Sequence, residues 1–227
     1  MTGAGISAES GIRTFRASDG LWENHRIEDV ATPYAWEKDP ELVWGFYQGR
    51  RRQLLEVKPN PAHDALVVLE NYLDEFLLIT QNVDNLHSRA GSKKLIHMHG
   101  ELCKLRCEIC REVVVAMDED HLQQKYVACT SCDNERLRPH IVWFHEMPLH
   151  MREIDAAVVD CDVFIAIGTS GHVYPAAGLL DIAQTYGAHC IGINLEPPKN
   201  VDYFDEFHQG KAGELLPQLI QKWILGE

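Results

Sequence analysis

The sequence predicts an α/β fold, in which a Rossmann-like parallel sheet carries helices on both faces and a small zinc-ribbon module is inserted. Three observations predict this class. Short apolar runs at residues 76–80, 163–168 and 189–194 have the length of buried strands in a parallel sheet. Segments with helical apolar periodicity at 154–159, 176–186 and 215–225 lie between or after these strands. Residues 101–139 break the alternation with short, charged pieces that contain two Cys-x-x-Cys pairs.

Two helix starts precede the first of these strands. Asp39 is followed by Pro40, and Asn60 is followed by Pro61, each before a run of apolar positions. Asp and Asn are favoured N-cap residues, and Pro suits the first helical position because its missing N–H would have no partner there. We therefore expect helices to begin at residues 40 and 61.

Length and composition bound the domain organisation. A chain of 227 residues, 45% of them hydrophobic, can bury one substantial core and has room for a small appended module. We expect a large domain of residues 1–100 and 140–227, with residues 101–139 as the module. No apolar stretch approaches the roughly 20 residues that span a bilayer, and the N-terminus lacks the pattern of a secretory signal. The expected location is the cytoplasm, with no membrane partner.

The formal net charge of −13 argues against nucleic acid as a partner, because phosphate binding needs a basic surface. An acidic surface would attract Lys-rich protein substrates. Ordinary solubility charge explains the same number, and the charge alone does not choose between these two explanations.

Four of the seven cysteines have the spacing of a zinc ribbon. The 18 residues between the two pairs (111–128) fall within the range of four-thiolate zinc sites. Four thiolates leave no coordination position for water, so the metal is expected to be structural rather than catalytic. The predicted ligands are Cys107, Cys110, Cys129 and Cys132. The alternative is two unrelated pairs of reduced cysteines.

Polar clusters follow each predicted strand, and in open parallel sheets ligands bind beyond the carboxyl ends of the strands. The sequence therefore predicts a binding crevice there. The clusters are Gln81, Asn82, Val83 and Asp84; Gly168, Thr169 and Ser170; and Asn194, Leu195 and Glu196. Near the N-terminus, the small residues from Gly3 to Ala8 would let backbone N–H groups approach a phosphate, although tight backbone packing explains them equally well.

Two histidines are candidates for general-base chemistry. His97 and His99 alternate with other residues in an extended segment, so both point to the same face, and spacing cannot choose between them. Such histidines are more often core residues or metal ligands than catalytic groups.

Together, these motifs resemble the sirtuin family in order and spacing. The set comprises Gly3-Ala4-Gly5-Ile6-Ser7, Gly11-Ile12-x-x-Phe15-Arg16, Gln81-Asn82-x-Asp84, His99-Gly100, the two Cys pairs, Gly168-Thr169-Ser170 and Asn194-Leu195. Each motif alone indicates the family only weakly, but their joint occurrence over essentially the whole chain is specific to it. Within the family, the chain resembles the bacterial CobB-type (class III) NAD-dependent protein deacylases, a class that includes desuccinylases.

The resemblance implies that the large domain binds NAD and that the acyl-lysine of a protein substrate enters between it and the zinc module. In such enzymes the acyl oxygen attacks the nicotinamide ribose, nicotinamide leaves, and a neutral histidine then deprotonates a ribose hydroxyl. By position, His99 matches that base. The positions that match cofactor contacts are Gly3, Ala4, Gly5, Ser7, Ala8, Phe15, Arg16, Trp22, Gln81, Asn82, Val83, Asp84, Gly168, Thr169, Ser170, Asn194, Leu195, Glu196 and Ala212.

An acidic acyl chain is suggested by Tyr47 and Arg50, which i,i+3 spacing places on one face of the helix that begins after Asp39. A phenol and a planar guanidinium can together hold a carboxylate. The alternative is that the arginines at 50–52 form a solvated helix face. The resemblance favours the pocket, because these residues and the small Ala31 match the acyl pocket of sirtuin desuccinylases. It also implies that residues 26–58 contribute to this pocket and that Val142 and Phe144 contact the substrate.

Two features depart from the family pattern. The family has an apolar strand before its Thr-Gly-Ala-Gly motif, whereas this chain begins at Met1 and Thr2. We expect a translation start further upstream; the alternative is that neighbouring strands close the gap. His145 stands where the family more often has Gly, so a peptide preference cannot be carried over.

The predicted function is NAD-dependent lysine deacylation of proteins, covering acetyl, succinyl and malonyl groups, with nicotinamide, O-acyl-ADP-ribose and free lysine as products. Two alternatives stay open. One is mono-ADP-ribosyl transfer at the same NAD site, and the other is a catalytically inactive zinc-ribbon interaction module.

Overall fold

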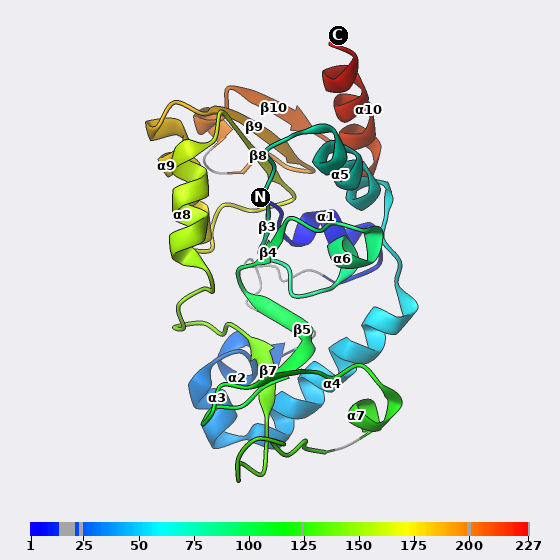
Figure 1. Ribbon diagram of the computed structural model, residues 1–227, viewed down its shortest axis with the longest axis vertical. Helices are drawn as coiled ribbons and strands as arrows, with labels where there is room; N and C mark the ends of the chain where they lie inside the picture. The colour runs from blue at the N-terminus through cyan, green and yellow to red at the C-terminus, as the bar shows by residue number, and fades with distance from the viewer. Residues whose placement is uncertain (14–20, 23–24, 124, 199–200, 227) are drawn as a thin grey trace.

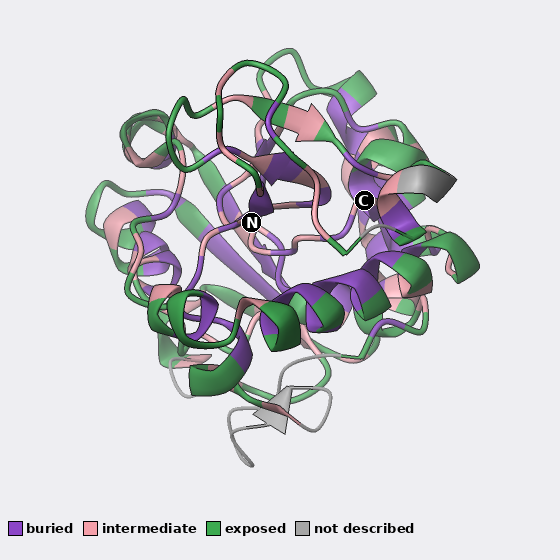
Figure 2. Ribbon diagram, turned by 90° about the horizontal axis from the view of Figure 1, so that it is seen from below, coloured by how far each residue is buried: buried purple, intermediate pink, exposed green. Residues whose placement is uncertain are grey.

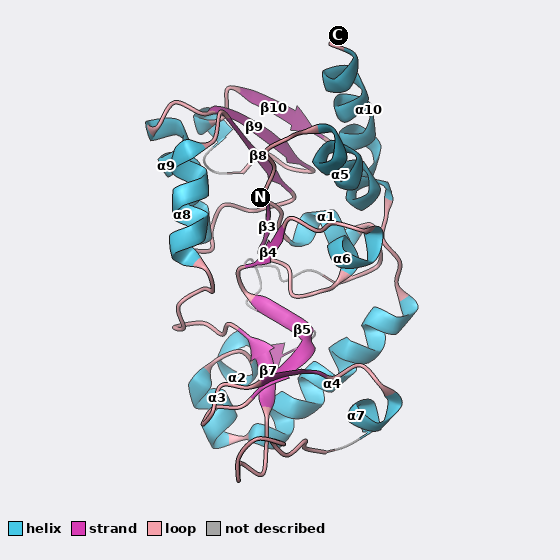
Figure 3. Cartoon of the chain, in the orientation of Figure 1, coloured by secondary structure: helices cyan, strands magenta, loops and turns pink. Residues whose placement is uncertain are grey.

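A parallel sheet forms the centre of the larger part of the computed structural model, which describes residues 1–13, 21–22, 25–123, 125–198 and 201–226 (Figures 1 and 3). Its strands are β3 (Leu78–Thr80), β4 (Leu95–His97), β8 (Val163–Ile167), β9 (His189–Asn194) and β10 (Glu206–Gln209). β3 pairs with β4, β8 with β9, and β9 with β10, and every pair is parallel. The predicted α/β class is confirmed, and β8 and β9 begin at the predicted residues.

Residues 1–3 lie in the middle of this sheet. Thr2 forms parallel bridges both to Thr80 of β3 and to Ile167 of β8. The Thr2 N–H donates to the Ile79 carbonyl at 2.8 Å, and the Gly3 N–H donates to the Ile167 carbonyl at 2.9 Å. Among the described residues β3 and β8 do not pair directly, so the neighbouring strands do not close the gap.

Helices cover both faces of the sheet (Figure 1). On one face, α5 (Pro61–Tyr72) and α10 (Ala212–Leu225) bury Leu66, Leu216 and Ile220 together with Ile167 and Ile193 of the strands. On the other face, α8 (Met151–Asp160) and α9 (Leu179–Thr185) form a second core with β8 and β9. In Figure 2 the central strands are buried, whereas the outer helix surfaces are exposed. The predicted helix 176–186 begins with a 3-10 turn, Ala176–Gly178.

The two predicted helix starts are confirmed at atomic detail. α4 (Pro40–Glu56) begins after Asp39, whose carboxylate accepts the Leu42 N–H at 3.0 Å. Asn60 caps α5 in the same way, because its side-chain oxygen accepts the Ala62 N–H at 3.0 Å. Each side chain satisfies one of the N–H groups that the first helical turn leaves without a partner.

The smaller part combines an antiparallel sheet with short helices. The sheet consists of β5 (Gly100–Arg106), β6 (Val113–Val115) and β7 (Arg138–Ile141), with β5 in the middle. α2 (Ile27–Val30), α3 (Pro33–Lys38) and α4 share one hydrophobic core with this sheet, and α7 (Glu119–Gln123) lies near α4 (Figure 1). The predicted module boundaries, 100/101 and 139/140, fall inside β5 and β7. These three strands carry no clear alternation in the sequence and were not predicted.

The remaining elements are short: α1 (Ala4–Ala8), β1 (Leu21–Trp22), β2 (His25–Arg26), α6 (Leu86–Ala90) and the 3-10 turn Val201–Tyr203. Among the described residues, no helix combines the length and the apolar character needed to cross a membrane.

Candidate functional site

The three polar clusters meet at the carboxyl edge of the parallel sheet. The side chain of Gln81, after β3, donates to the Thr169 hydroxyl, after β8, at 3.1 Å. The side chain of Asn194, after β9, donates to the Thr169 carbonyl at 3.0 Å. The three clusters predicted from the strand ends are therefore connected to one another by hydrogen bonds to Thr169.

Backbone packs directly on backbone where the N-terminal segment meets β8. The Gly5 N–H donates to the Gly168 carbonyl at 2.8 Å. A Cβ atom on Gly3 would lie 2.8 Å from the Gly168 carbonyl oxygen, and one on Gly5 would lie 2.7 Å from the Gly168 Cα. Only glycine permits this approach. The glycines therefore serve tight packing, while Ala4 and Ala8 between and after them are exposed.

Asn82 ties the loop after β3 to the N-terminal segment. Its buried amide donates to the Gly3 carbonyl at 3.0 Å and to the Ser7 hydroxyl at 3.1 Å. Asp84 is also buried, and one carboxylate oxygen accepts the Leu86 N–H at 3.1 Å. Between them, the Val83 carbonyl accepts the Leu102 N–H at 2.7 Å, which joins this loop to β5.

His99 is held in one tautomer. Its Nδ1 lies 3.1 Å from the Gln81 carbonyl oxygen, and a carbonyl can only accept, so Nδ1 carries the proton and Nε2 presents a lone pair. Burial lowers the pKa of His99, and the bond to Gln81 opposes this to a smaller extent. The imidazole is therefore neutral near pH 7, as a general base must be.

His97 differs from His99 at the second ring nitrogen. Its Nδ1 lies 3.3 Å from the Asn82 carbonyl oxygen, but its Nε2 is buried and has no hydrogen-bond partner among the described residues. Both side chains are half-buried, but only the Nε2 of His97 faces the interior of the fold.

Tyr47, Arg50 and Ala31 lie together in the core of the smaller part, with exposed fractions of 0%, 7% and 1%. The Tyr47 hydroxyl accepts the indole N–H of Trp143 at 2.9 Å. The solvated-face alternative is wrong for Arg50 and for the neighbouring Arg51, which is only 1% exposed.

The segment after β7 joins this pocket to His99. The Val142 N–H donates to the His99 carbonyl at 2.9 Å, and the Phe144 N–H donates to the Ala31 carbonyl at 3.0 Å. His145 adopts a left-handed backbone conformation with φ of 72°, the region that favours glycine. The structure therefore brings the predicted base, acyl pocket and substrate segment into one continuous region.

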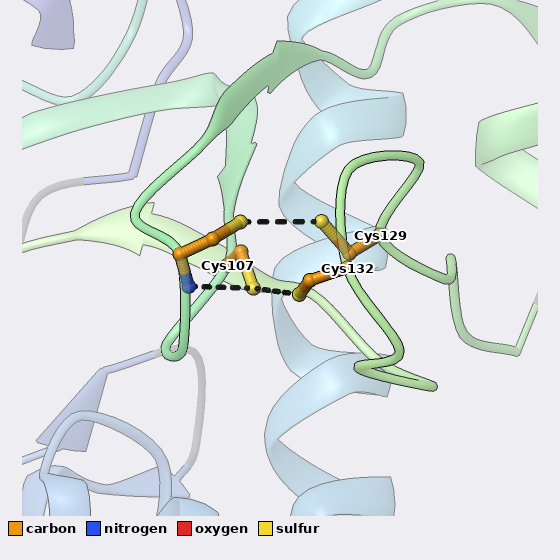
Figure 4. A group of neighbouring side chains, drawn as sticks. Cys107, Cys129 and Cys132 are labelled. Atoms are coloured by element: carbon orange, nitrogen blue, oxygen red, sulfur yellow. Dashed lines mark hydrogen bonds between the residues drawn. The ribbon is translucent and has the colours of Figure 1, made fainter.

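The four predicted metal ligands converge, with Cys107 and Cys110 before β6 and Cys129 and Cys132 before β7. Figure 4 labels three of them, Cys107, Cys129 and Cys132. Their sulfur atoms all lie within 4.8 Å of one another, and the Cys107–Cys132 and Cys110–Cys129 sulfur distances are both 3.5 Å. A tetrahedral Zn²⁺ with bonds of about 2.3 Å separates its sulfurs by roughly 3.8 Å. The cluster therefore fits zinc. N–H groups of Cys110 and Asn134 donate to the Cys107 sulfur, as expected for a thiolate ligand.

The remaining residues that were predicted to contact the cofactor lie in several parts of the chain. Phe15 and Arg16 lie outside the described residues, and Trp22 lies in β1, paired with His25. Ala212 is buried at the start of α10 in the same core as Ile6. Three residues at strand ends are exposed: Ser170, Leu195 and Glu196.

The model of the Sir2 family matches residues 3–175 of this chain. The chain belongs to the Sir2 family. The resemblance to sirtuins is thereby confirmed, along with the Rossmann-like fold that accompanies it.

Relatives of this Sir2-family chain include the NAD-dependent protein deacylase of Pasteurella multocida (strain Pm70), 54% identical over 227 residues, which covers 99% of this chain and 96% of the relative. A crystal structure of a Sir2 homologue in complex with NAD is 40% identical, with a TM-score of 0.90, covering 99% of this chain and 88% of the other. A Sir2 protein bound to a myristoylated histone peptide is 33% identical, with a TM-score of 0.79, covering 99% and 90%.

An ion-pair network beside Trp143 and Tyr47 was not predicted from the sequence of this Sir2-family chain. Arg138 and Glu146 form two bonds of 2.8 and 2.9 Å, and Arg106 donates to the same carboxylate at 3.1 Å. Residues 101–139 were interpreted only as short, charged pieces of an inserted module, and Glu146 lies outside that range. Arg138 is 3% exposed, and no local pattern in the sequence indicates that burial.

Proposed function

We propose that this Sir2-family NAD-dependent protein deacylase removes acetyl, succinyl and malonyl groups from lysine side chains, releasing nicotinamide, O-acyl-ADP-ribose and free lysine. The names of its relatives support the deacylase class. The complex of a relative with a myristoylated histone peptide supports acylated proteins as substrates. The cytoplasm stays the expected location.

The clusters around Thr169 would hold NAD, which supplies the ribose that accepts the acyl group and the nicotinamide that leaves. Gln81, Asn82 and Asp84 lie on the loop that connects this region to His99, and their hydrogen bonds fix this loop. Such preorganisation avoids an ordering cost during the reaction.

His99 is the proposed base. With Nδ1 donating to the Gln81 carbonyl, the free lone pair of Nε2 can take a proton from a ribose hydroxyl. The four cysteines would hold a structural zinc, which organises the loops beside the acyl pocket and takes no part in the chemistry.

One observation carries the acyl preference: a buried phenol and a buried guanidinium lie one helical turn apart beside Ala31. Burial raises the pKa of Tyr47, more than its bond from Trp143 and the charges of Arg50, Arg138 and Arg51 lower it. The phenol therefore stays protonated and can donate. A protonated phenol surrounded by positive charge suits a carboxylate at the end of a succinyl or malonyl chain.

The test compares acetyl-, malonyl- and succinyl-lysine forms of one peptide, with NAD, on three proteins. Wild type should remove all three groups, and His99→Ala should lose at least about a hundredfold of activity on each. Tyr47→Phe/Arg50→Met should lose desuccinylation and demalonylation at least about tenfold more than deacetylation. Equal losses on the acetyl and succinyl peptides would show that the pair does not select the acyl group.

Product analysis separates this function from its alternatives. Mass spectrometry should find O-acyl-ADP-ribose and no ADP-ribose attached to protein, which mono-ADP-ribosyl transfer would produce. Calorimetry should detect NAD binding, which an inactive zinc-ribbon module would lack.

A further inference from the structure

Trp143 contacts the Tyr47 hydroxyl from the segment that follows β7. Its indole Nε1 lies 2.9 Å from the phenol oxygen, and both side chains are buried. An indole N–H can donate a hydrogen bond but cannot accept one. The phenol oxygen is therefore the acceptor in this contact, and the phenol's own proton must point elsewhere.

We infer that Trp143 sets the direction of the Tyr47 hydroxyl, so that the phenol donates its proton toward the carboxylate of an acidic acyl chain. This inference rests on the proposed function of Tyr47 and extends it to a residue that does not touch the acyl group. Trp143 is thus a positioning residue for acyl specificity. A neutral acetyl group offers the phenol no carboxylate, so its removal depends little on this orientation.

The surroundings of Trp143 hold the indole in place at two points. The Trp143 backbone N–H donates to a carboxylate oxygen of Glu146 at 2.8 Å. The guanidinium carbon of Arg138 lies 3.4 Å from the centre of the indole ring, a close cation–π contact. Arg138 is fixed in turn by its two bonds to Glu146, so the ring, its backbone and the ion pair form one rigid unit.

A second tryptophan provides a matched control. Trp36 packs against Trp143 with ring centroids 6.0 Å apart, and its own indole N–H donates to Glu108 rather than to Tyr47. Both indoles are almost fully buried in the same core. Replacing either by phenylalanine removes one indole N–H and a similar volume, but only Trp143→Phe removes the bond to the phenol.

The experiment measures kcat and KM for succinyl- and acetyl-lysine forms of one peptide at saturating NAD. In Trp143→Phe, the succinyl-to-acetyl ratio of kcat/KM should fall about three- to tenfold, mainly through the KM for the succinyl peptide. Trp36→Phe should keep the wild-type ratio within about twofold. In the Tyr47→Phe background, adding Trp143→Phe should change the ratio no further, because the partner of the indole N–H is already gone.

An unchanged ratio in Trp143→Phe, or an additive effect in the double variant, would overturn the inference. If wild type does not remove succinyl groups, or if Tyr47→Phe leaves the ratio unchanged, the proposed function itself fails.

A measurement on folded wild type covers the case in which Trp143→Phe does not fold. In NMR spectra of the indole N–H groups, Tyr47→Phe should change the chemical shift of the Trp143 signal. Succinyl-lysine peptide should shift the same signal in wild type, while acetyl-lysine peptide leaves it in place. No shift with the succinyl peptide would also contradict the inference.

Discussion

His99 can take up a proton only at Nε2, because its Nδ1–H is already donated to the Gln81 carbonyl. Burial lowers the pKa of the imidazole below its ordinary value of 6.5. The proposed role as general base requires the neutral ring, so activity should be constant near pH 7 and fall about tenfold per pH unit below the His99 pKa, which lies under 6.5.

The pH profile of kcat/KM checks this, and acetyl and succinyl peptides should give the same acid limb, because one base serves both. An acid limb above pH 7 would mean that another group controls the rate.

Gly168 is a glycine of this site whose replacement should be costly. It has a φ of +63°, and an added Cβ would overlap the Ile6 backbone nitrogen, which cannot move aside. Gly168→Ala should therefore lower the free energy of unfolding by at least about 3 kcal/mol. Gly187 has a similar φ of +89° but nothing within 4 Å of the added Cβ, so Gly187→Ala should cost only about 1 kcal/mol. Urea denaturation measures both, and equal losses would show that the crowding at Gly168 is relieved.

At the scale of elements, Asn60 does more than cap α5. Besides accepting the Ala62 N–H, its amide donates to the Ile6 carbonyl at 2.8 Å and to the Ser10 hydroxyl at 2.9 Å. It therefore ties the start of α5 to α1 and the segment that follows it.

Asn60→Ala should lower the free energy of unfolding by about 2 to 3 kcal/mol, because it removes a cap and leaves a buried carbonyl without its donor. Asp39→Ala, at the exposed cap of α4, should cost only about 0.5 to 1 kcal/mol. Chemical denaturation of both variants gives the comparison. Equal costs would mean that the contacts of Asn60 with Ile6 and Ser10 add nothing to the cap.

At the scale of the whole molecule, a metal bound by the four cysteines would hold together loops that share a core with the proposed acyl pocket. Cys107 and Cys129 belong to the same hydrophobic cluster as Tyr47 and Trp143. Removing the metal should therefore disorder these loops and abolish deacylation, not merely loosen a peripheral module.

Metal analysis should find about one equivalent of zinc, and Cys129→Ser should lose both this zinc and the activity. Cys161→Ser is the control, because Cys161 lies outside the cluster, in the loop between α8 and β8, and should keep both. Full activity of a zinc-free protein would contradict a structural role.

Features whose cause is local could be predicted from the sequence. Helix starts at Asp39 and Asn60 follow from a side chain and an N–H two or three residues apart, so capping residues predicted them. The strands β8 and β9 follow from short apolar runs, and the convergence of the four cysteines follows from two pairs with the spacing of a zinc ribbon. The order of motifs along the chain was enough to predict the family and its fold.

Only the tertiary structure decided which polar groups are buried and what they contact. His97 and His99 are equivalent by alternation. In the structure they differ, because the His97 Nε2 is buried, whereas the His99 carbonyl accepts the N–H of Val142. The contact between Trp143 and Tyr47 joins residues 96 positions apart. Burial of a charge depends on partners supplied by distant elements, and no local pattern encodes them. For the same reason, the position of Thr2 between β3 and β8 became visible only in the folded sheet.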